Sequence, residues 1–171
     1  MKATLWQRFN QIVCNLVPLF LILGLAVVSV LPMRLPYYAD VAPMLTVIGV
    51  GYWSIVRPDL MRPSFAFGCG VFEDLLTGTS LGFNALVLLC IHAMVASQRR
   101  FFLGKSFLVW WWAFALVALV AVLLKWFLFA VIVDAIIPLD RVLFSYVITV
   151  LIYPLWGRLF ASLEVALVRE G

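Results

Sequence analysis

Five polar side chains stand out in this sequence because their types could do chemistry inside an apolar environment. Ionisable groups in a bilayer usually face protein or water, and they often mark an ion path, a substrate path or a structural ion pair. Two of them are adjacent, in the glycine-rich stretch from Arg57 to Asn84. The five residues are Glu73, Asp74, Asn84, His92 and Lys125.

The spacing of these residues argues against catalysis. Neighbours on a helix point about 100° apart, so Glu73 and Asp74 do not form the facing acid/base pair of glycoside chemistry. His92 has no second histidine or cysteine at metal-ligand spacing. The sequence contains neither a GxSxG nucleophile motif nor a Walker A loop. The three cysteines form no CxxC pair. We therefore expect no enzyme, no metal and no cofactor.

The composition indicates an integral membrane protein. The chain has 171 residues, of which 66% are hydrophobic and 12% charged, whereas soluble domains carry about 25% charged residues. We expect one membrane domain over residues 1–171, with membrane lipid around it. The net charge of +4 comes from the flanks of apolar segments, so nucleic acid is not an expected partner.

Apolar segments predict an all-α fold with six transmembrane helices, since about 20 apolar residues cross a ~30 Å hydrocarbon core. The expected spans are residues 12–31, 41–56, 63 to about 81, 83–97, 107–133 and 142–159. Six spans place both termini on one side. If that side is cytoplasmic, nine basic residues lie inside, two outside (Arg34 and Arg141), and Lys125 in the membrane. The positive-inside rule therefore predicts cytoplasmic termini.

The third span carries a helical stripe of mostly small residues. Ala66, Gly70, Asp74 and Gly78 recur every four residues and so share one face. Because small residues allow close approach in membranes, Ala66, Gly70 and Gly78 are expected to pack against another helix.

Helix depths favour a pair between Asp74 and Lys125, with an axial offset of about 4–5 Å at 1.5 Å per residue. Glu73 is the competing partner on a different face of the same helix, and Asp74 is preferred because it shares the stripe with Gly70 and Gly78. A lysine that snorkels outward is the simpler alternative. His92 is expected to be a neutral, hydrogen-bonded residue rather than a proton relay. Asp40 could cap the second helix.

Three motifs in order resemble the bacterial rod shape-determining protein MreD family. They are the turn Arg57-Pro58-Asp59, a glycine-rich apolar helix with an acid (Gly68–Asp74–Leu75), and a turn from Gly78 through Gly82 to Ala85. The resemblance implies a multi-pass protein of the bacterial inner (cytoplasmic) membrane in the cell-elongation machinery, which couples peptidoglycan synthesis to rod shape.

The same resemblance implies partners and an alternative. It implies a non-enzymatic scaffold or regulator that docks MreC and, through that complex, MreB, RodA and a class B transpeptidase, with no small-molecule substrate. The family is also similar in fold to the substrate-binding subunits of energy-coupling-factor transporters. A substrate-binding subunit of a vitamin-type transporter is therefore the alternative, although outer turns of about five to nine residues leave little material for a lid.

Overall fold

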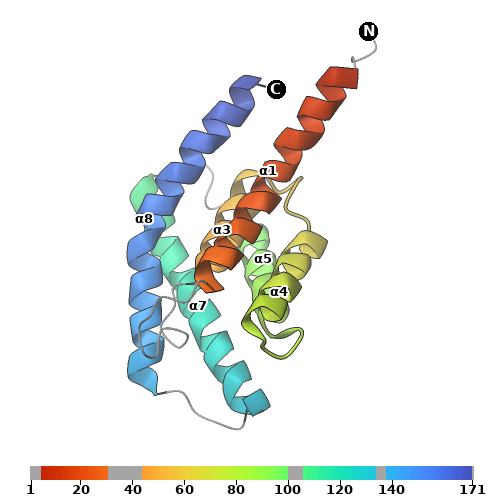
Figure 1. The fold of residues 1–171 in the computed structure, drawn as a ribbon. Coiled ribbons are helices and arrows are strands. Elements are labelled where there is room, and N and C mark those ends of the chain that lie inside the picture. The colour runs from red at the N-terminus through yellow and green to blue at the C-terminus, as the bar shows by residue number, and fades with distance from the viewer. Residues whose placement is uncertain (1–4, 31–43, 100–105, 134–137, 171) are drawn as a thin grey trace.

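The computed structural model describes residues 5–30, 44–99, 106–133 and 138–170. Six helices lie in this part of the chain, in the order predicted from the apolar segments. With the labels of Figure 1, they are α1 (Leu5–Val30), α3 (Leu45–Val56), α4 (Pro63–Thr77), α5 (Phe83–Ser97), α7 (Phe107–Val133) and α8 (Leu139–Glu170). The all-helical prediction is confirmed for these residues, whereas Arg34 and the proposed cap Asp40 lie outside them.

The helices form two packed sets. Helices α1, α3, α4 and α5 pack on one another and make up what we call the four-helix group. Helices α7 and α8 form a long hairpin, whose main contacts with the group are α7 on α5 and both hairpin helices on α3. The tightest pair of the whole arrangement is α4 with α5.

The two ends of the bundle differ in the chain segments they carry (Figure 1). The start of α1 and the end of α8 lie at the same end of the bundle, apart from each other, and we call it the terminal end. The turn between α4 and α5 lies at the opposite end, with the end of α7 and the start of α8, and we call this the turn end. Both ends of the chain thus lie at the same end of the bundle, as expected of a chain that crosses a membrane an even number of times.

Helix lengths are uneven. Two helices, α7 and α8, are long and apolar enough to cross a membrane by length and composition. Helices α3, α4 and α5 have 12, 15 and 15 residues, or about 18–22 Å at 1.5 Å per residue, which is shorter than a ~30 Å hydrocarbon core. The third span was predicted to run to about Leu81 but ends at Thr77, because Gly78 turns into the left-handed region with φ 68°.

The buried side chains lie along the contacts between helices. Helix α3 is the central element, since every residue from Leu45 to Ile55 is buried. A Cβ at Gly49 would lie 2.9 Å from Cγ1 of Ile22, so the glycine lets α1 and α3 approach closely.

Candidate functional site

The α4–α5 turn is built by two glycines and one carboxylate. Gly78 caps the end of α4 with φ 68°, and Gly82 precedes α5 with φ 98°. Residues other than glycine rarely adopt such backbone angles. The Gly-x-x-Leu-Gly motif therefore encodes a tight reversal that brings the start of α5 back against the last turn of α4.

Asp74 fastens this reversal. Its Oδ2 accepts a hydrogen bond of 2.8 Å from the N–H of Gly82, and its Oδ1 accepts one of 2.8 Å from the N–H of Asn84. The hydroxyl of Thr79 donates to Oδ1 at 3.0 Å. Asp74 is fully buried, yet both of its oxygens have donors and it faces the positive end of the α5 dipole. The carboxylate is thus a cap for α5 supplied by α4.

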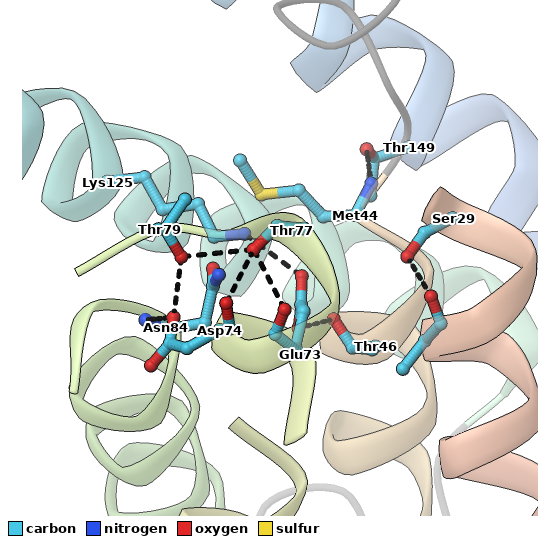
Figure 2. Close-up of polar contacts among 11 residues, drawn as sticks. Ser29, Met44, Thr46, Glu73, Asp74, Thr77, Thr79, Asn84, Lys125 and Thr149 are labelled. Atoms are coloured by element: carbon cyan, nitrogen blue, oxygen red, sulfur yellow. Dashed lines mark hydrogen bonds and ion pairs between the residues drawn. The ribbon is translucent and has the colours of Figure 1, made fainter. Parts of the chain in front are cut away.

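Glu73 points to a different set of helices (Figure 2). Its Oε2 accepts a 2.7 Å hydrogen bond from the Thr46 hydroxyl of α3, and its Oε1 lies 3.6 Å from Nζ of Lys125 on α7. The predicted pair between Asp74 and Lys125 was therefore wrong: the competing partner, Glu73, takes the lysine. The reason is that the backbone donors of α5 already satisfy Asp74.

Asn84 joins the same cluster from α5. Its backbone N–H binds Asp74, and its side chain is 3% exposed. The side-chain oxygen Oδ1 is buried and has no hydrogen-bond partner among the described residues. Four of the five polar residues singled out in the sequence thus lie together, and we call Glu73, Asp74, Asn84 and Lys125 the polar cluster.

His92 lies apart from the polar cluster. It follows Asn84 by eight residues, about 12 Å along α5, and its Nδ1 is 2.8 Å from the Ser54 hydroxyl of α3. Ser54 donates its one hydrogen to the Val50 carbonyl at 2.6 Å. Its oxygen must therefore accept from His92, which assigns the ring proton to Nδ1. The buried histidine ties α5 to α3, as expected of a hydrogen-bonded residue.

The small-residue stripe of α4 divides into two parts. A Cβ at Gly70 would collide with the Cα of Ala85 and lie 2.8 Å from the carbonyl carbon of Asn84. Ala66 is fully buried. A Cβ at Gly78, by contrast, would meet nothing within 4 Å, so the packing role expected for this glycine is wrong. Its role is the left-handed cap.

The Arg57-Pro58-Asp59 motif forms the turn between α3 and α4. The carbonyl of Arg57 accepts from the N–H groups of Leu60 and Met61 at 3.1 and 3.0 Å. Arg57 and Asp59 form only a long, exposed ion pair of 4.0 Å. The motif therefore shapes a turn at the terminal end rather than joining the polar cluster.

Sequence patterns did not single out the two threonines that complete the polar cluster, nor a third that links the start of α3 to α8. Thr46 binds Glu73, and Thr79 binds Asp74. Thr149 of α8 accepts the backbone N–H of Met44 at 3.0 Å. A hydroxyl inside an apolar span was the only available signal, and it is weak because threonine is common in membrane helices.

Comparison with known proteins decides the family. The family model described as rod shape-determining protein MreD matches residues 9–163, nearly the whole chain. The chain belongs to the MreD family. The resemblance carried by the three motifs is thereby confirmed, and with it a role in cell shape and a place in a membrane. No curated protein and no solved structure matches this chain.

For this MreD protein, the geometry of the polar cluster points to a structural task. The cluster links α3, α4, α5 and α7 through side-chain contacts. Groups of three or more histidine, cysteine or acidic side chains able to hold a metal do not occur among the described residues. What the arrangement can do is fix how four helices sit relative to one another.

Proposed function

We propose that this protein is a non-enzymatic, six-span scaffold of the bacterial inner membrane that docks MreC. Through that complex it would engage MreB, RodA and a class B transpeptidase. The observation that carries the proposal is the family match over residues 9–163. The geometry supports the non-enzymatic part of the proposal, because the buried carboxylates Glu73 and Asp74 bind donors within the protein.

The membrane orientation is part of the same proposal. We place the terminal end in the cytoplasm and the turn end on the outer side. Nine of the twelve basic residues then lie inside, in agreement with the positive-inside rule. The start of α1 and the end of α8 lie at the same end of the bundle, which supports an even number of spans (Figure 1).

The scaffold would present mainly lipid-facing surfaces to its partners. Helix α7 exposes Trp112, Leu116 and Phe127, and α8 exposes Leu151 and Leu155. In a bilayer, helices associate through van der Waals packing and interhelical hydrogen bonds rather than through hydrophobic burial. A transmembrane helix of a partner could therefore pack on such a face.

Co-purification tests the docking proposal. The full-length chain, affinity-tagged and solubilised in a mild detergent, should retain co-expressed MreC, whereas an unrelated six-span membrane protein at the same level should not. Equal recovery of MreC on both baits would contradict the proposal. Cross-linking in intact membranes before solubilisation protects the result from detergent effects.

A further inference from the structure

The interface between the four-helix group and the α7–α8 hairpin is densely aromatic toward the terminal end. Tyr52 and Trp53 of α3 contact Phe160 of α8 with ring centroids 5.3 and 6.0 Å apart. Tyr52 also lies beside Trp110 of α7, with ring centroids 6.1 Å apart. Large rigid rings that interlock in this way resist separation of the helices.

Toward the turn end, the same interface is held differently. Helix α7 buries aliphatic side chains there, Ala118, Ala121 and Val122, and packs Leu124 and Leu128 against the core, with no aromatic ring among these five. Polar ties complete the contact: the hydrogen bond from Met44 N–H to the Thr149 hydroxyl at 3.0 Å, and the Glu73–Lys125 ion pair. Such ties can break and re-form without creating a large cavity, whereas aromatic packing cannot.

The Glu73–Lys125 pair joins two helices that form no extended contact with each other among the described residues. The 3.6 Å separation exceeds the ~2.7–2.9 Å of a strong charge-assisted hydrogen bond. The side chain of Lys125 is 19% exposed, and that of Glu73 is 7% exposed. Thr46 holds the carboxylate in place at 2.7 Å. Glu73 is therefore the fixed partner and the flexible lysine the movable one.

We propose that the Glu73–Lys125 ion pair is a latch that closes the turn end of the hairpin against the four-helix group. When Lys125 leaves Glu73, the turn end opens and the aromatic packing at the terminal end acts as the hinge. The latch is a property of this chain alone and does not depend on MreC docking.

Spin-label distances at the two ends test the latch. The turn-end pair is Leu75 of α4 with Val131 of α7, and the terminal-end pair is Phe67 of α4 with Leu108 of α7. All four side chains are well exposed, by 66%, 64%, 48% and 61% respectively, so labels attached there avoid the core. The full-length chain, with its native cysteines replaced, is measured in lipid nanodiscs by pulsed electron paramagnetic resonance.

Lys125→Met should shift the turn-end distance distribution to longer values and broaden it, while the terminal-end distribution stays as in the parent. Leu123→Met, at a lipid-facing position of the same helix, should change neither. A turn-end distribution that is unchanged in Lys125→Met would overturn the latch. So would an equal shift at both ends, because the pair would then hold the whole fold. Glu73→Gln, which keeps the bond to Thr46, provides the second variant and should reproduce the turn-end shift.

Discussion

At the scale of single residues, Gly70 and Gly68 provide a matched pair on one helix. A Cβ at Gly70 would meet the backbone of α5 at Asn84 and Ala85, whereas a Cβ at Gly68 would meet nothing within 4 Å. Backbone cannot move aside as a flexible side chain can. Gly70→Ala should therefore lower the free energy of unfolding by ~1–3 kcal/mol or more. Gly68→Ala should leave it unchanged or raise it by a few tenths, since alanine favours helix.

The measurement for this pair is the midpoint of thermal unfolding of each purified variant, together with its level in membranes. Similar losses in both variants would show that α4 and α5 do not touch at Gly70.

Asp74 allows a second prediction at this scale. Asp74→Asn removes the charge and places an amide N–H₂ against donors that now bind carboxylate oxygen. Hydrogen bonds to charged groups contribute about 1.5–3 kcal/mol each. We expect a loss of about 2–4 kcal/mol in unfolding free energy, because the cap of α5 fails.

The control for Asp74→Asn is Asp59→Asn. Asp59 is 76% exposed at the side chain and forms only a 4.0 Å surface pair with Arg57, and such pairs contribute ~0–1 kcal/mol. If denaturant titration gives the two variants the same stability, the buried cap is not what holds the turn.

At the scale of helices, the sequence predicted which segments are helical and which residues are polar, but not how the polar residues pair. Periodicity placed Asp74 on the stripe with Gly70 and so favoured it for Lys125. The actual partner depended on the turn, because Gly78 and Gly82 fold α5 back until its N–H groups reach Asp74. That geometry depends on two left-handed glycines whose angles a stripe of residues does not reveal.

The ends of the helices were also predicted only in part from the sequence. The start of α4 at Pro63 and the bounds of α5 and α7 agree with the sequence prediction, because proline and clear apolar runs mark them. The end of α4 came earlier than predicted, and α8 extends beyond residue 159 to Glu170. An amphipathic extension past an apolar span leaves no break in helix propensity for a hydropathy argument to detect.

Aromatic packing between α3 and α8 gives a prediction for this scale. Phe160 is fully buried against Tyr52 and Trp53, whereas Phe144 of the same helix is 57% exposed. In a bilayer, lipid-facing and buried rings are equally removed from water. The two variants should therefore differ in unfolding free energy only through the cavity that Phe160→Ala leaves. At ~24 cal/mol per Å³, a cavity on the order of 100 Å³ costs about 2 kcal/mol.

Unfolding of the detergent-purified variants measures this difference. Phe160→Ala should be clearly destabilised, and Phe144→Ala should stay close to the parent chain. The opposite order would mean that α8 faces the group with its other side.

At the scale of the whole molecule, the orientation makes a simple prediction. A reporter fused after Gly171 should be cytoplasmic, and one inserted at Pro138, between α7 and α8, should be on the outer side. Nine basic residues against two support this orientation. A paired cytoplasmic and periplasmic reporter measures both sites, and an outside signal at Gly171 would contradict the six-span topology.

Cell shape tests the central claim most directly, since the claim is that a six-helix body built around the polar cluster serves rod-shape determination. The chain is depleted in its own host while plasmid-borne variants are expressed, and cell width and length are measured by microscopy. Depleted cells should lose rod shape and regain it with the parent chain or Gly68→Ala, but not with Gly70→Ala or Asp74→Asn. Cells that remain rods after depletion would contradict the proposed function, and full rescue by Asp74→Asn would contradict the structural role of the polar cluster.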